Sequence, residues 1–327
     1  MYQPGSRTLY SDVDYMLLDF VIEQVTGKRL DDYLSETFWK PMGLQHITYR
    51  PLDHGFAPND CAATELNGNT RDGAISFTGV RTYTLQGEVH DEKAYYAMGG
   101  VSGHAGLFAN ASDLAVLASA MLSGGYGNVK LFSRNVMDTF TAPKIESAAN
   151  WGLGWWREGD LARPWYFGTQ SSSGTVGHQG WTGTLSLIDP AERLVVVYLT
   201  NKINSPVTDP AANPNQFDGN WYTASTLGFV AQLLYQGLKS RAGSPDAALD
   251  ALLADMTAEH FKLVDAEPTA ARADHPLVQS AYAMLEVLAE RGAQPFRFAA
   301  RRYAQQALEL LDPVRDADEL AALREQI

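Results

Sequence analysis

The chain has 327 residues, of which 45% are hydrophobic, 11% aromatic and 19% charged, a composition that predicts a soluble globular protein of about two domains. No apolar run approaches the ~20 residues that a bilayer-spanning helix needs. The formal net charge of -13 argues against nucleic acid and against an anionic membrane surface as partners. A single cysteine, Cys61, excludes an internal disulfide and is expected to pack as a small hydrophobe.

The first residues carry turn chemistry and lack the basic start and apolar core of a signal peptide, so we expect the chain to begin within a domain. Beyond them, apolar residues at helical spacing predict a helix with Ser11 or Asp12 as its N-cap and Gly27 as its C-cap. The stripe consists of Val13, Met16, Leu17, Phe20 and Val21. A short helix over 31–38 should end before Pro41.

Turn residues dominate 48–96, which predicts a long ordered loop, and such loops in compact domains are usually functional. A glycine cluster over 98–108 precedes a helix whose apolar stripe includes Leu114 and Leu117, with Asn110 or Ser112 as its cap. Another helix is expected over 133–140, ahead of an aromatic strand over 151–156.

A glycine-rich segment, 176–184, runs directly into the apolar residues 185–188. Glycine only weakens a strand unless another group must approach its backbone closely, so we expect this segment to form one wall of a site. After a turn at 189–192, the apolar run 194–199 completes a predicted β-hairpin. A further helix is expected around 227–235.

Composition changes near Lys239, because all 7 tryptophans precede it and the rest is rich in alanine, leucine and charge. We therefore predict one domain over 1–239, a linker over 240–245 and a helical tail over 246–327. No catalytic motif is found in the tail.

Three motifs occur in order: Tyr10-Ser11-Asp12 at a helix start, GGVSGHAGLF over 99–108, and GHQGWTGT over 177–184. Together they resemble the serine β-lactamase and penicillin-binding-protein superfamily, class C-like. Within it, the segments YSDVDYMLL, AATELNGNTRDG, VHDEKA and NKINSPVTDP are similar to a penicillin-binding-protein branch of enteric bacteria, over residues 2–239.

The resemblance implies an α+β fold of the β-lactamase/transpeptidase type, an antiparallel sheet flanked by helices, here lacking its first part. Its Tyr-x-Asn and His-x-Gly elements map to Tyr10 with Asp12 and to His178 with Gly180. Tyr10 would take a serine proton, and His178 would contact the substrate carboxylate. The N–H of Trp181 would serve an oxyanion hole. The remaining predicted substrate-binding residues are Gln179, Gly180, Thr182 and His104.

Two departures from the family pattern stand out. Asp12 replaces the usual asparagine, which puts a carboxylate near the reaction, although Asp12 could equally be a simple N-cap. No serine in the chain is followed three residues later by lysine, so the Ser-x-x-Lys nucleophile motif is absent; in the family it lies upstream of the tyrosine. The resemblance implies a serine hydrolase of D-alanyl peptides or β-lactams, with this chain inactive alone. The alternative is a non-catalytic remnant that binds a ligand.

His90, Asp91 and His104 could suggest a metal site, but no ligand spacing supports one, and neither metal nor cofactor is expected. The stretch around Ser102 superficially resembles a nucleophile elbow but lacks its final glycine, so we expect a tight turn that lines the site. The expected partners are a small-molecule or peptidoglycan-peptide substrate and, through an exposed sheet edge along 194–200, a second copy of the chain. The resembling family is periplasmic or associated with the inner membrane, whereas a chain without a leader would be cytoplasmic.

Overall fold

A computed structural model describes residues 3, 6, 9–144, 150–159, 163–221, 227–239, 317, 318 and 321. The chain divides into two compact units, each described here by itself: Met1–Ala162 with Ser172–Phe217, and Arg163–Ser171 with Asp218–Ile327. Within the described ranges, no helix is both long enough and apolar enough to cross a membrane.

The first unit begins with helix α1 (Asp12–Thr26), whose N-cap is Ser11 and whose C-cap is Gly27, as the sequence predicts. Gly27 adopts a left-handed conformation with a φ of 69°, which a residue without a Cβ reaches at no steric cost. The predicted second helix consists of α2 (Leu30–Leu34) and a turn of π-helix, η1 (Ser35–Trp39), and it ends before Pro41.

The predicted long loop contains only short elements. They are β1 (Ile47–Tyr49), η2 (Pro51–His54), η3 (Pro58–Asp60), β2 (Ala63–Glu65), η4 (Gly68–Thr70), β3 (Leu85–Gln86) and α3 (Glu92–Met98). β2 pairs with β3, and β1 pairs with β4 (Leu107–Ala109), both antiparallel. The pairing of β1 with β4 attaches the glycine cluster at 98–108 to the start of the loop.

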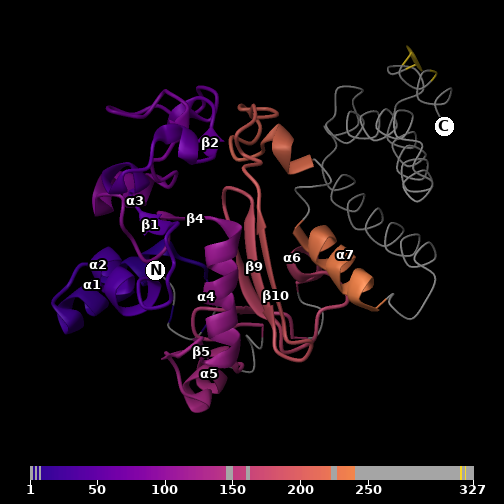
Figure 1. Ribbon diagram of the computed structural model, residues 1–327. Helices are drawn as coiled ribbons and strands as arrows, with labels where there is room; N and C mark the ends of the chain where they lie inside the picture. The colour runs from indigo at the N-terminus through magenta and orange to yellow at the C-terminus, as the bar shows by residue number, and fades with distance from the viewer. Residues whose placement is uncertain are drawn as a thin grey trace. The chain divides into compact units, whose positions relative to one another are not determined.

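The main sheet has four antiparallel strands in the order β10-β9-β8-β7, namely β10 (Leu194–Leu199), β9 (Thr184–Asp189), β8 (Val176–Gly180) and β7 (Trp156–Arg157). Helix α4 (Ala111–Ser123), capped by Asn110, lies against β9 and β10 (Figure 1). Buried Ala118 of α4 packs there on Val176 and Ile188. The first unit is completed by β5 (Gly125–Tyr126), β6 (Val129–Lys130) and α5 (Arg134–Thr141).

Two strand predictions require correction. The glycine-rich run is not one extended strand, because a tight turn over 181–183 separates β8 from β9, closed by a hydrogen bond from Gly183 N to Gly180 O of 3.1 Å. Of the predicted strand over 151–156, only Trp156 lies in a strand, while Trp151 forms an isolated bridge to it. The predicted hairpin of β9 and β10 is confirmed, with Val196 opposite Leu187.

The second unit contains α6 (Pro164–Phe167), η6 (Asp218–Trp221) and α7 (Leu227–Lys239), and α7 confirms the helix expected there. Within this unit, α6 and α7 pack together, and Phe167, Leu227 and Tyr235 are fully buried. The proposed linker, and the tail apart from residues 317, 318 and 321, lie outside the described residues, so the predicted boundary stays a prediction.

Candidate active site

Tyr10 lies directly ahead of α1, and its side chain is 62% exposed. Ser11 is extended, with φ and ψ of -148° and 126°, so the chain changes direction between Tyr10 and the first turn of the helix. The phenol ring reaches two aromatic groups from the far part of the sequence: its centroid lies 6.5 Å from that of Trp151 and 6.0 Å from that of His178. The structure therefore brings Tyr10 to the glycine-rich strand.

His178 is held by the sheet. It pairs with Ser186 of β9, and its ring lies 4.2 Å from that of Trp156 on the neighbouring strand. The Nδ1 atom is 2.6 Å from the carbonyl oxygen of Gln179, so Nδ1 carries a proton and donates it to that oxygen. In the neutral imidazole, this tautomer leaves Nε2 as the acceptor nitrogen.

The four residues after His178 form the end of β8 and the turn beyond it. Gln179 and Gly180 are the last residues of β8, and Trp181, half exposed, and Thr182 lie in the turn. A Cβ placed on Gly180 would collide with the side-chain oxygen of Thr184, which explains why glycine stands at this position. One close approach to this backbone is therefore made by a neighbouring side chain, and the approach of a substrate stays a prediction.

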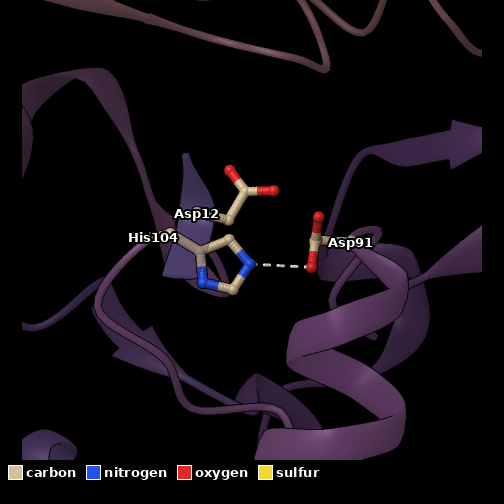
Figure 2. A group of neighbouring side chains, drawn as sticks. All are labelled: Asp12, Asp91 and His104. Atoms are coloured by element: carbon tan, nitrogen blue, oxygen red, sulfur yellow. Dashed lines mark hydrogen bonds and ion pairs between the residues drawn. The ribbon is translucent and has the colours of Figure 1, made fainter. Parts of the chain in front are cut away.

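Asp12, Asp91 and His104 form a second group, shown in Figure 2. One carboxylate oxygen of each aspartate and one ring nitrogen of His104 all lie within 4.8 Å of one another. His104 Nε2 donates to Asp91 Oδ1 at 2.9 Å, and Asp91 also accepts the N–H of Ala94 at 2.8 Å, which caps α3. Asp12 accepts a hydrogen bond from Lys93 Nζ at 2.9 Å. Each carboxylate thus has a cationic or hydrogen-bonding partner of its own. Lys93 had no predicted role.

These partners fix the protonation states of the group. Burial raises the pKa of the Asp91 carboxyl, but the hydrogen bonds from His104 and Ala94 outweigh it and lower that pKa to about 2. The hydrogen bond to Asp12 raises the pKa of the Lys93 ammonium. Asp91 is therefore ionised, and Lys93 charged, at neutral pH. Two carboxylates and an imidazole are groups that could hold a divalent cation, but the ammonium of Lys93 already supplies a positive charge beside Asp12.

Ser102 is fully buried, and its Oγ lies 2.8 Å from Nδ1 of His104. With Asp91 on the other nitrogen, serine, histidine and aspartate form a continuous hydrogen-bonded row. The backbone carbonyl of Ser102 also accepts the hydroxyl of Tyr49 at 3.1 Å. Because Ser102 is fully buried, its hydroxyl is closed to a substrate, and the row holds the glycine cluster in place.

The phenol of Tyr10 stands in a negative environment. Burial raises its pKa, and the carboxylates of Asp12 and Asp91 raise it further. Tyr10 is therefore a neutral phenol at neutral pH in this chain. A tyrosine that takes a proton from serine needs a nearby cation to lower its pKa, so the described residues assemble only part of a proton-transfer site.

A buried ionic cluster, unforeseen from the sequence, supports Asp91 from the loop side. Glu65, 2% exposed, accepts hydrogen bonds from Arg71 and from His90, the residue before Asp91. Arg71 also donates to Glu92 at 3.0 Å. The signal available in the sequence was the charged residues scattered through an otherwise turn-rich loop, which only the fold brings together.

The structure thus places the predicted site residues in two groups that meet at α1. Tyr10 lies with His178 and the end of β8, and Asp12 lies with His104. A separate apolar cavity of about 590 Å³ lies between α4, α5 and the turn before β10. None of the predicted site residues lines this cavity. The charged residues among its walls are Arg134, Asp138 and Arg193.

Comparison with known proteins agrees with this fold and with these motifs. The sequence model of the family described as Beta-lactamase matches residues 1–220. The chain therefore belongs to the beta-lactamase family, the superfamily of serine β-lactamases and penicillin-binding proteins, and has its α+β fold. This is a family of serine hydrolases, as the sequence motifs imply.

Two curated relatives, each named "Putative D-alanyl-D-alanine carboxypeptidase", come from Escherichia coli strain K12 and Salmonella typhi. Both are 52% identical, over 241 and 239 residues respectively, which is 73% of this chain and 55% of each relative. The chain thus spans about half the length of these relatives. A solved structure, an octameric penicillin-binding protein homologue from Pyrococcus abyssi, is 17% identical and aligns with a TM-score of 0.46 over 75% of this chain and 45% of its own.

Proposed function

We propose that this chain forms the tyrosine and histidine side of an acyl-serine site that acts on D-alanyl peptides or β-lactams. The observation that carries the proposal is the approach of the Tyr10 ring to within 6.0 Å of the His178 ring, although the two residues are far apart in the sequence. The names of the curated relatives support the peptide substrate. The nucleophile is assigned to the portion of those relatives that lies outside the match.

In the proposed reaction, a serine oxygen bonds to the substrate carbonyl carbon, and its proton passes through Tyr10 to the departing amine. Water then releases the acyl group as a carboxylic acid and restores the serine. His178, at the centre of β8, would hold the substrate carboxylate. The N–H of Trp181 would stabilise the oxyanion, an interaction often worth ~3 kcal/mol.

The chain alone is expected to bind a substrate without forming an acyl-enzyme. The sequence contains no serine followed three residues later by lysine, and Ser102, beside His104, is buried. Units of this kind lose several orders of magnitude in rate when one member is removed. Binding without turnover is therefore the second function to test for the isolated chain.

The test compares the chain alone with an extended protein, in which the part of the Escherichia coli relative that precedes its match is joined ahead of residue 1. Both are incubated with a fluorescent penicillin and examined by intact mass. We expect one covalent adduct on the extended protein and none on the chain alone. Tyr10→Phe should slow acylation of the extended protein by about 10²-fold or more, whereas Tyr126→Phe, at an exposed tyrosine elsewhere, should leave it unchanged.

Release of D-alanine from a D-alanyl-D-alanine peptide then separates carboxypeptidase from β-lactamase activity. An adduct on the chain alone would overturn the assignment of the nucleophile, and Ser102 would be the first residue to substitute. An extended protein that folds but acylates equally well with Tyr10→Phe would overturn the role of Tyr10.

A further inference from the structure

Helix α1 has its apolar side turned away from its own unit. Its only fully buried residue is a carboxylate, Asp19, 2% exposed. The exposed fractions of its large apolar side chains are 52% for Val13, 57% for Leu17, 52% for Leu18, 51% for Phe20, 55% for Val21 and 79% for Val25. An amphipathic helix of a globular protein normally shows the opposite arrangement, with its apolar stripe on the core.

These six side chains form one surface. At ~100° of rotation per residue, they cover an arc of about 160°, which we call the outer face of α1; Asp14 and Gln24 interrupt it. The inner side is already occupied: Asp19 is buried beside Gly103, and Ile22 packs on the core cluster that contains Leu30 and Trp39. The outer face therefore cannot turn inward without breaking existing contacts.

The outer face begins where the candidate site lies. Tyr10 and Leu9, 62% and 47% exposed, stand ahead of Val13 in the chain. A nucleophile that exchanges a proton with Tyr10 must come within about 3 Å of its hydroxyl. A polypeptide that places it there lies close to the first turn of α1, because Tyr10 directly precedes Ser11, the N-cap of that helix.

We propose that the outer face of α1 is the docking surface for the segment that brings the nucleophile to Tyr10. This inference rests on the proposed function and names the partner of the same site. The curated relatives contain enough chain for the role, because 241 matched residues make up only 55% of the Escherichia coli protein. A helix of 15 residues is about 22 Å long, and a single packed helix of similar length would cover it.

Charge favours the same occupant. Asp14 is the one charged residue of α1 on the outer face, because Asp12, Asp19 and Glu23 lie on the other side of the helix. A second copy of α1 packed in parallel would therefore bring two aspartates together there. A segment that carries a lysine near its nucleophile would instead offset Asp12 and Asp91 beside Tyr10. One partner thus supplies both an apolar cover for α1 and a cation to lower the pKa of Tyr10.

The first experiment measures accessibility. In a Cys61→Ser background, Leu17→Cys is introduced into the chain alone and into the extended protein, with Tyr126→Cys as a matched control at an exposed aromatic position outside α1. Maleimide should label both introduced thiols quickly in the chain alone. In the extended protein, labelling of the Leu17→Cys variant should slow at least 10-fold while labelling of the Tyr126→Cys variant is unchanged. Equal labelling of the Leu17→Cys variant in the two proteins would overturn the docking surface.

The second experiment uses separate polypeptides and keeps the inference apart from the proposed function. The tagged chain is co-expressed with the preceding part of the Escherichia coli relative, and co-purification and penicillin labelling are both measured. Leu17→Lys with Val21→Lys should abolish co-purification, whereas Tyr126→Lys should not. Co-purification without labelling would leave the docking surface standing and overturn the proposed function. If penicillin still labels the co-expressed pair when Leu17→Lys and Val21→Lys are both present, the docking surface is overturned and the proposed function stands.

Light scattering on the chain alone distinguishes the other occupants. A dimer that the two lysines dissolve would assign the outer face to a second copy and overturn the inference. A dimer that persists in the presence of the two lysines would instead be formed through β10, the strand at the edge of the described sheet, pairing with β10 of a second copy. That result would leave the outer face of α1 free for the proposed segment.

Discussion

Lys93 and Asp12 form an ion pair, with Nζ 2.9 Å from Oδ2. Asp12 lies two residues after Tyr10 in the chain. The pair joins the start of α1 to the start of α3, and it compensates one of the two carboxylates that raise the pKa of Tyr10. The family pattern has asparagine at the position of Asp12. In this chain, the carboxylate of Asp12 and the ammonium of Lys93 therefore replace the neutral amide of that asparagine.

We expect Asp12→Asn to lower the pKa of Tyr10, because it removes a negative charge near the phenol, and Lys93→Met to raise it, because the carboxylate of Asp12 then loses its cation. The measurement is the titration of ¹³Cζ-labelled tyrosine by NMR, with the Tyr10 signal assigned by Tyr10→Phe. Lys28→Met, whose partner is Glu36, is the matched control and should leave the signal in place. A Tyr10 titration unmoved by Asp12→Asn would show that Asp12 does not act on the phenol.

Asp19 should make the first unit less stable as the pH rises from acid. Burial raises the pKa of its carboxyl to about 6, well above the ordinary ~3.9 that it has when unfolded. The native state therefore binds more protons between pH ~4 and ~6, and the free energy of unfolding falls as pH increases through that window.

Asp19→Asn keeps the size of the buried side chain and an acceptor oxygen, and it removes the ionisation. Between pH ~4 and ~7, the unmodified chain should lose about 1–2 kcal/mol of stability more than this variant, as measured by urea denaturation. Asp14→Asn, on the exposed side of the same helix, is the control. Parallel pH profiles for Asp19→Asn and the unmodified chain would contradict the prediction.

The ion pair of Arg71 and Glu65 should matter more than a surface pair, because both side chains are buried. Arg71→Met leaves the carboxylate of Glu65 without its guanidinium, and we expect a loss of about 3 kcal/mol. Arg134→Met removes a pair between two exposed side chains, Arg134 and Asp138, and should cost less than about 0.5 kcal/mol. Thermal denaturation checks both, and comparable losses in the two variants would show that the buried cluster has no special role.

Elements with a strong local signal were predictable from the sequence. Helix α1 begins after Ser11, whose side chain makes no capping hydrogen bond, and ends at the left-handed Gly27, whereas α4 is capped by the side chain of Asn110. Signals of this kind act within a few residues of the helix end. The direction of the apolar stripe of α1 was not predictable. Periodicity shows that one side of α1 is apolar, but which side meets the unit depends on distant partners such as Gly103.

The candidate site divides in the same way. Tyr10, Asp12, His104 and His178 could be named as candidates because they belong to motifs that are read along the chain. Lys93 and the Glu65 cluster were missed, because an ion pair between α1 and α3, or between a loop and α3, leaves no fixed spacing in the sequence. The tight turn between β8 and β9 was also missed, since its glycines suit an extended strand and a turn equally well.

That turn supplies the last prediction. Gly183 has a φ of +108°, and a Cβ there would collide with the hydroxyl of Thr200 and approach Cγ of Lys202 to 2.7 Å. The carbonyl of Gly183 also accepts both the N–H and the hydroxyl of Thr200, at 3.1 Å and 2.6 Å, so the turn cannot move away freely. Gly127 has a φ of +56° with nothing within 4 Å of a Cβ, so a substitution there reports the backbone effect alone.

Gly127→Ala should cost about 1 kcal/mol, and Gly183→Ala about 2–4 kcal/mol, in urea denaturation. Because the turn carries Trp181 at the end of β8, Gly183→Ala should also weaken acylation of the extended protein, whereas Gly127→Ala should not. Equal losses of stability for the two variants would mean that the contact with Thr200 relaxes and that the turn does not depend on glycine for space.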